Sequence, residues 1–213
     1  MIVLGIDPGY AIVGCGVVEY DGFNYRMLHY GAVTTEAHTP FNERLELIYD
    51  GIKQLIDLYH PDAVSMEKLF FNTNQKTAID VAQARGVTVL AVQKSGIPIY
   101  EYTPLQVKQG MVGYGRAEKH QVQEMVRSTL GLKEIPKPDD AADALAMAIC
   151  HCNAAGSLIA KAVAGEIESE SYEDRIKKAE LKSSRPPVSH DSTSAIAEKL
   201  RNELKAKMNN KSD

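Results

Sequence analysis

Four acidic residues stand where carboxylates could do chemistry. Asp7 and Glu67 each directly follow a short apolar run, the pattern of a buried strand. Asp140 and Asp143 are three residues apart, so a helix that begins there carries both carboxylates on one face. A charge at the end of a buried strand is costly unless it is paired or binds a cation. Each acid alone is also an ordinary feature of a strand end or of a helix N-terminus.

As a set, the four acids indicate a site for divalent metal. If the strands of Asp7 and Glu67 are neighbours, a helix start laid across their ends gathers four anions that repel one another. Lys68 is the only basic residue within these motifs. Hard oxygen ligands select Mg²⁺ or Mn²⁺ over zinc. Two such ions about 4 Å apart can activate water and stabilise a leaving oxygen in phosphodiester hydrolysis. The pattern alone leaves the alternative of purely structural acids open.

The elements that must position these acids follow from hydrophobic periodicity. Three strands are predicted at 1–6, 11–20 and 24–34, the last two joined by a hairpin turn at Asp21-Gly22. Beyond them the sequence predicts a helix at 41–59, a strand at 63–66, a helix at 75–94, a strand at 97–102, a glycine-punctuated loop at 110–115, and helices at 117–130 and 139–153. This order predicts an α/β fold, a mixed five-stranded sheet with helices on both faces.

Composition divides the chain into a folded part and a tail. The 213 residues are 44% hydrophobic and carry a net charge of −4, and the excess of acid lies in residues 1–156. Residues 157–213 are Ser-rich, charged and poor in aromatics, which predicts a mobile or conditionally helical tail after a domain at 1–156. The chain lacks an apolar run of the roughly 18 residues that a membrane span needs, and its opening does not resemble a signal peptide. These features predict a cytoplasmic protein without a membrane partner.

The three cysteines, Cys15, Cys150 and Cys152, have no zinc-type spacing. Cys150 and Cys152 are too close in the chain to be two ligands of one tetrahedral site. We therefore expect all three to be reduced packing residues.

Six short motifs occur in order within residues 5–144. They are Gly5-Ile6-Asp7-Pro8-Gly9, Glu67-Lys68-Leu69-Phe70, Gln83-Ala84-Arg85-Gly86, Val107-Lys108-Gln109, Gly113-Tyr114-Gly115-Arg116-Ala117-Glu118-Lys119 and Asp140-Ala141-Ala142-Asp143-Ala144. Together they closely resemble the RuvC family of Holliday junction resolvases over roughly residues 1–153. The resemblance implies an RNase H-like fold, a homodimer and Mg²⁺-dependent nicking of two opposed strands, with Mn²⁺ as a substitute. By motif it assigns Asp7, Glu67, Asp140 and Asp143 as the catalytic acids that bind two ions.

The same resemblance implies which residues touch DNA. An acidic domain that binds DNA needs a local basic surface, because the contact face sets phosphate neutralisation. Lys108 and Lys119 would contact phosphates of the scissile strand, and Arg116, in the glycine loop, is an intermediate case between a DNA contact and a solvated side chain. Phe70 would stack on or unstack a base at the crossover. The implied partners are a four-way DNA junction, a second copy of the chain and the branch-migration complex RuvAB.

The helix expected at 75–94 carries small residues at four-residue spacing: Ala78, Ala82 and Gly86. Such a row lets another backbone approach closely. That backbone belongs either to the protein's own sheet or, in a dimer, to a second copy.

Other classes of protein share part of this pattern. The opening Gly5-Ile6-Asp7-Pro8-Gly9 also resembles the first phosphate loop of actin-like sugar kinases and Hsp70-type ATPases, but those need two such domains and more residues. A junction-binding module without catalysis would not need the four acids. A ribonuclease H or a transposase core would share the fold and the acids. The glycine loop with Lys119 and the Phe70 segment favour the resolvase among these.

Overall fold

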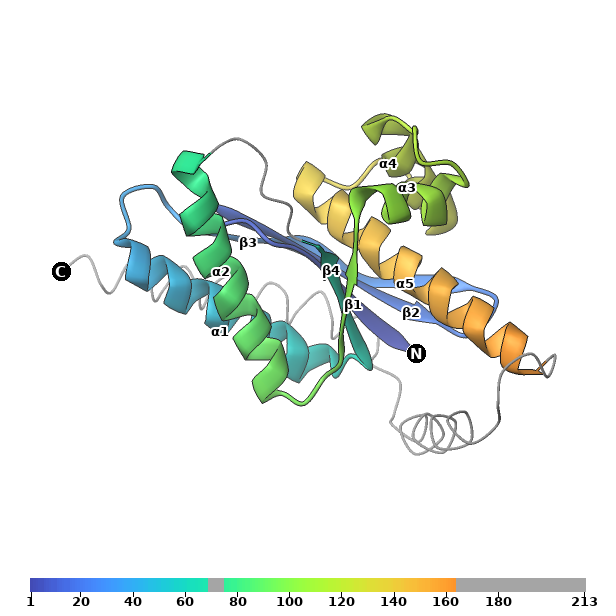
Figure 1. The fold of residues 1–213 in the computed structure, drawn as a ribbon, viewed down its shortest axis with the longest axis horizontal. Helices are drawn as coiled ribbons and strands as arrows, with labels where there is room; N and C mark the ends of the chain where they lie inside the picture. Colours follow the sequence, from blue (N-terminus) through green and yellow to red (C-terminus); the bar gives the residue numbers. More distant parts are fainter. Residues whose placement is uncertain (69–74, 164–213) are drawn as a thin grey trace.

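A mixed five-stranded sheet in the order β3-β2-β1-β4-β5 lies at the centre of the protein (Figure 1). Its strands are β1 (Ile2–Asp7), β2 (Ile12–Tyr20), β3 (Tyr25–Thr34), β4 (Ala63–Glu67) and β5 (Ile99–Tyr102). β1 pairs antiparallel with β2 and parallel with β4, while β2–β3 is antiparallel and β4–β5 parallel. The predicted sheet is therefore confirmed in its strand number and its mixed character.

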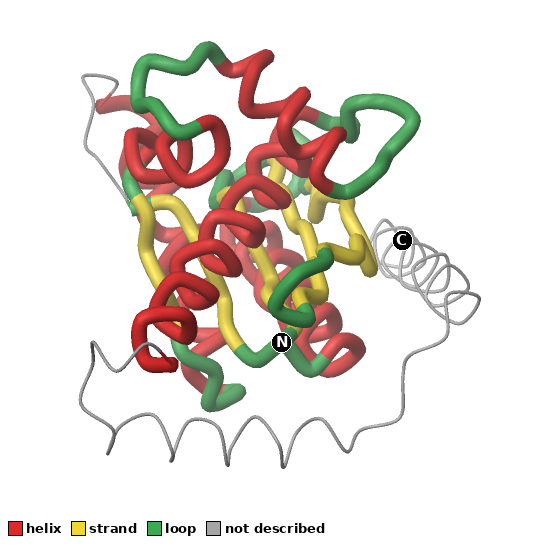
Figure 2. Tube along the Cα trace, turned by 90° about the vertical axis from the view of Figure 1, so that its right-hand side faces the viewer, coloured by secondary structure: helices red, strands yellow, loops and turns green. Residues whose placement is uncertain are grey.

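Helices cover both faces of this sheet, as predicted (Figures 1 and 2). They are α1 (Phe41–Tyr59), α2 (Gln75–Lys94), α3 (Pro104–Val112), α4 (Lys119–Thr129) and α5 (Asp139–Val163). One core cluster joins the sheet to α1 and α2, and a second joins the opposite face to α3, α4 and α5.

The computed structural model describes residues 1–68 and 75–163. Phe70 and almost all of the predicted tail lie outside these ranges. Within them, no helix is both long enough and apolar enough to cross a membrane.

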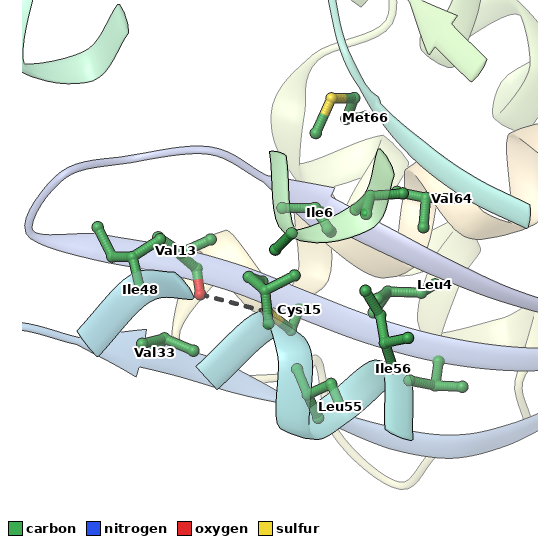
Figure 3. Close-up of a cluster of buried hydrophobic side chains, with 14 of the residues drawn as sticks. Leu4, Ile6, Val13, Cys15, Val33, Ile48, Leu55, Ile56, Val64 and Met66 are labelled. Carbon is green, nitrogen blue, oxygen red and sulfur yellow. Dashed lines mark hydrogen bonds between the residues drawn. The ribbon is translucent and has the colours of Figure 1, made fainter. Parts of the chain in front are cut away.

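The alternation of side chains along β1 decides which face receives Asp7. Leu4 and Ile6 are fully buried in the cluster beneath α1 and α2, shown in Figure 3. Val3 and Gly5 point the other way, toward α5. Because successive residues of a strand face opposite sides, Asp7 continues the series that faces α5.

The sequence pattern predicts a strand at 97–102 and a loop at 110–115 with no helix between them, whereas the structure has α3 there. In the structure Thr103 is the N-cap of α3: its side chain accepts a hydrogen bond from the Gln106 backbone, and the Gln106 side chain accepts one from the Thr103 backbone. Pro104 occupies the first turn, where a missing N–H costs nothing. The pair that ends β5 therefore also starts α3.

Helix α5 extends beyond the predicted end at residue 153, to Val163. Gly156 lies inside the helix, where one glycine costs only about 1 kcal/mol relative to alanine. A Cβ at Gly156 would lie 3.0 Å from the Tyr20 hydroxyl, so the glycine suits a close approach to β2. The division of the chain after residue 156 stays a prediction, since residues 164–213 lie outside the described part.

Candidate active site

Asp7 and Glu67 lie at the ends of adjacent strands. β1 and β4 are parallel, and their register pairs Ile6 with Met66. The next residue on each strand is the acid, so both carboxylates are at the same edge of the sheet. Ser65 of β4 faces α5, since its hydroxyl donates to the Met147 carbonyl. Glu67 is two residues further along the strand and therefore faces the same side. The predicted gathering of the four acids requires the strands of Asp7 and Glu67 to be neighbours, and β1 and β4 are paired in the sheet.

A track of glycines lets α5 lie directly on the sheet beside these acids. Gly14 is opposite Asp7 in the antiparallel register. A Cβ at Gly14 would overlap the carbonyl oxygen of Asp140 and lie 2.9 Å from the Asp140 Cβ. Cβ atoms at Gly5 and Gly16 would likewise collide with α5 one turn further on. The absence of side chains at these positions brings the first turns of α5, with Asp140 and Asp143, to Asp7.

The four carboxylates form one electrostatic cluster. Burial, followed by the charges of Asp143, Glu67 and Asp140, raises the pKa of Asp7 from 3.8 to about 7. Burial and Asp143 also raise the pKa of Glu67. A partly buried acid among other acids resists ionisation, so the site favours a bound proton or another cation.

This cluster makes the stability of the metal-free protein dependent on pH. Between the unfolded pKa of 3.8 and the folded value of about 7, the folded state binds more protons at Asp7 than the unfolded state does. The free energy of unfolding should therefore fall as pH rises through this window. Urea unfolding in a chelator at pH 5 and pH 8 measures the fall, which should be smaller in Asp7→Asn. An equal fall in the free energy of unfolding of both proteins would show that Asp7 is not the group responsible.

Lys119 is part of the acidic cluster. Its Nζ lies 2.9 Å from Oδ2 of Asp143 and 3.7 Å from Oδ2 of Asp139. The hydrogen bond to Asp143 raises the pKa of the Lys119 ammonium. Glu118 is the N-cap of α4 in a capping box with Gln121, which makes Lys119 the first residue of the helix. The sequence prediction singled out this lysine, and the structure adds its ion pair with a predicted catalytic acid.

Lys108 and Arg116 belong to the same α3–α4 segment. Lys108 is half-buried on α3, and Arg116 is exposed in the connection between α3 and α4. Phe70 is outside the described residues. The structure therefore pairs Lys119 with Asp143 of the acidic cluster, while contacts of Lys108, Arg116, Lys119 and Phe70 with DNA stay predictions.

A buried arginine holds the turn that follows Asp7, and the sequence prediction missed it. Arg44 is 8% exposed. Its Nε donates to the Thr35 hydroxyl at 2.9 Å, and its guanidinium also donates to the Tyr10 carbonyl at 3.2 Å and lies over the Tyr10 ring. The sequence does contain a sign of this role: Arg44 is four residues before Ile48 and so lies on the apolar face of α1. A charge on that face indicates a specific polar partner.

The donor set suits a hard divalent cation. Carboxylate oxygens are the ligands that Mg²⁺ and Mn²⁺ prefer, and the raised pKa of Asp7 reflects its burial and, after that, the negative charges of Asp143, Glu67 and Asp140. In residues 1–68 and 75–163, no three acidic, histidine or cysteine side chains already converge as the ligands of one ion. Cys15, Cys150 and Cys152 are free and buried, as predicted.

The sheet order, with acids at the ends of β1 and β4 and at the start of α5, defines the RNase H-like class of nucleases. The family model described as crossover junction endodeoxyribonuclease RuvC matches residues 3–151. The chain belongs to the RuvC family of crossover junction endodeoxyribonucleases, and it is an enzyme of the nuclease class. This result decides against the kinase, ATPase, ribonuclease H and transposase alternatives.

Several relatives support this assignment. The crossover junction endodeoxyribonuclease RuvC of Clostridioides difficile (strain 630) is 63% identical over 153 residues, which cover 72% of this chain and 90% of the relative. That of Ruminiclostridium cellulolyticum is 60% identical over 153 residues, or 72% and 92% of the two chains. Among solved structures, the RuvC of Thermus thermophilus in complex with Holliday junction substrate is 40% identical, with a TM-score of 0.71 over 74% of this chain and 96% of that one.

Proposed function

We propose that this enzyme resolves four-way DNA junctions by paired, symmetric nicks in strands of like polarity during recombination and repair. The observation that carries the proposal is the cluster of Asp7, Glu67, Asp140 and Asp143 at the junction of β1, β4 and α5 in a RuvC-family chain. The Thermus thermophilus relative, described in complex with Holliday junction substrate, supports the choice of substrate.

Asp7, Glu67, Asp140 and Asp143 would hold two Mg²⁺ ions, for which Mn²⁺ can substitute. Ions bound there would lower the pKa of an attacking water and stabilise the leaving oxygen of a phosphodiester. The protein's own part is to keep four carboxylates close together on a rigid sheet edge and helix start. Arg44 helps to hold Asp7 in place, because its hydrogen bonds to Thr35 and Tyr10 fix the turn after Asp7.

Basic side chains of the α3–α4 segment would hold the DNA against these acids. Lys108, Arg116 and Lys119 supply positive charge on an otherwise acidic domain, as phosphate contacts require. RuvAB is the proposed partner that delivers the junction.

A second copy of the chain would provide the second active site. On α2 the exposed face carries Ile79 and Leu90, 65% and 52% exposed, with Gly86 open between them. An apolar stripe of this kind suits a two-fold helix contact. We expect sedimentation equilibrium to give a dimer for the wild type and a larger monomer fraction for Leu90→Glu. A wild-type monomer at micromolar concentration would contradict the proposal.

Phe70 is proposed to help unstack bases at the crossover. Phe70→Ala should lose more activity on a fully paired junction than on a junction with unpaired bases at the crossover, because the second substrate needs no unstacking. Single-turnover rates on the two substrates measure the difference. Equal losses would make Phe70 a structural residue.

The function itself is tested by substrate choice. Purified enzyme with MgCl₂ should cut a four-way junction at symmetric positions and leave a linear duplex and an RNA–DNA hybrid intact. EDTA should stop cleavage. Equal cutting of the linear duplex, or preference for the hybrid, would overturn the proposal.

A further inference from the structure

Lys119 is bound to a carboxylate oxygen that a divalent cation would also use. Its Nζ lies 2.9 Å from Oδ2 of Asp143, with Oδ2 of Asp139 at 3.7 Å. Asp143 is also the acid whose charge most strongly disfavours ionisation of Asp7, so Lys119 is paired with a carboxylate that is coupled to the rest of the cluster. An ammonium here neutralises part of the charge that would attract metal.

We propose that Lys119 is the internal counterion of the acidic site, and that it exchanges Asp143 for a DNA phosphate when a divalent cation binds. The inference rests on the proposed function, since it takes the four acids as the ligands of that cation. A dication at Asp143 repels the Lys119 ammonium. At equal distance, the carboxylate attracts the dication about twice as strongly as it attracts the ammonium.

The side chain is built to make such an exchange. Lys119 is 56% exposed, and its flexible four-carbon stem carries three rotatable donors. Its backbone, in contrast, is held at the first turn of α4 by the Glu118–Gln121 capping box. The ammonium can therefore leave Asp143 for the solvent side, where DNA would lie, without disturbing the core.

The exchange predicts an order of events. While Lys119 pairs with Asp143, it is not available to a phosphate. Metal binding releases it, so the metal-loaded protein gains one phosphate contact. Lys119 thereby couples metal binding to substrate binding through a single side chain.

Calorimetric titration of the DNA-free protein with MnCl₂ tests the competition. Lys119→Met and Lys119→Gln should both bind Mn²⁺ roughly two- to fivefold more tightly than the wild type, the effect of losing one partly exposed ion pair. Lys53→Met is the matched control, because Lys53 forms an ion pair with Asp57 on α1, away from the site. Its affinity should equal that of the wild type. In an Asp143→Asn background, Lys119→Met should change the affinity less.

Unchanged or weaker Mn²⁺ binding by both Lys119 variants would overturn the exchange while leaving the metal site itself intact. If the wild type and Lys53→Met bind no Mn²⁺, the metal-dependent function fails, and the exchange fails with it. Thermal unfolding of each variant in EDTA verifies that the proteins compared are folded.

The release step is tested by the salt dependence of junction binding. In CaCl₂, with the junction verified intact, log Kd should vary more steeply with log [NaCl] for the wild type than for Lys119→Met, by about one phosphate contact. In EDTA the two slopes should be equal. Equal slopes in CaCl₂ would overturn the transfer of Lys119 to DNA.

Discussion

Replacing Asp7 by asparagine is expected to abolish junction cleavage while leaving junction binding intact. Burial, followed by the charges of Asp143, Glu67 and Asp140, raises the pKa of Asp7 to about 7, so this carboxylate is coupled to the other three acids. Even outer-shell partners of a bound metal contribute ten- to a hundredfold to affinity or activity, so loss of a direct ligand should cost more than about a hundredfold. Single-turnover cleavage and a gel-shift assay on one junction separate the two effects.

Stability distinguishes this role from a structural one. Asparagine removes one of several repelling charges, so the metal-free Asp7→Asn protein should be as stable as the wild type or more stable at pH 8. Glu67→Gln, Asp140→Asn and Asp143→Asn should likewise lose cleavage and keep binding. Asp57→Asn, on α1, is the matched control and should cleave normally. Unfolding or loss of binding in the four site variants would make these acids structural.

Gly14→Ala is expected to reduce cleavage by about a hundredfold without touching a catalytic side chain. The new methyl group would overlap the Asp140 carbonyl oxygen and crowd the Asp140 Cβ, so the start of α5 must move away from β2. A displacement of about 1 Å in a catalytic group can cost two orders of magnitude in rate. Overpacking of this kind also destabilises a protein by roughly 1–3 kcal/mol.

A neighbouring glycine provides the control for this substitution. Gly31 lies on β3, where a Cβ would meet only the His29 ring at 3.5 Å, an ordinary contact. Gly31→Ala should therefore retain cleavage and thermal stability. Cleavage rates and melting temperatures of both variants check the prediction. A fully active Gly14→Ala protein would show that α5 does not need this close approach.

Local pattern was sufficient for most of the elements and for the identity of the acids. Helix α1 occupies the predicted residues, because its apolar periodicity and its end before Pro61 are local properties. The apolar runs before Asp7 and Glu67 predicted two buried strands, and the spacing of Asp140 and Asp143 predicted their shared helix face. The combination of six motifs indicated the family that the comparisons confirm.

Tertiary structure decided how these parts meet. Strand order made Asp7 and Glu67 neighbours, and the alternation along β1 and β4 turned both toward α5. Such a pairing depends on contacts between residues far apart in the chain, which local periodicity does not encode. Only the packed fold shows that the missing side chain of Gly14 leaves room for the Asp140 backbone. The same holds for the ion pair between Lys119 and Asp143.

The buried Arg44 illustrates the same limit. Its type and its place on α1 are visible in the sequence, but its partners Thr35 and Tyr10 come from two other segments. Side-chain types along the chain thus determined which chemistry is available to this protein. The distances and burial that turn those side chains into one charged site arise only when the sheet and α5 pack, because electrostatic coupling depends on separation and on exclusion of water.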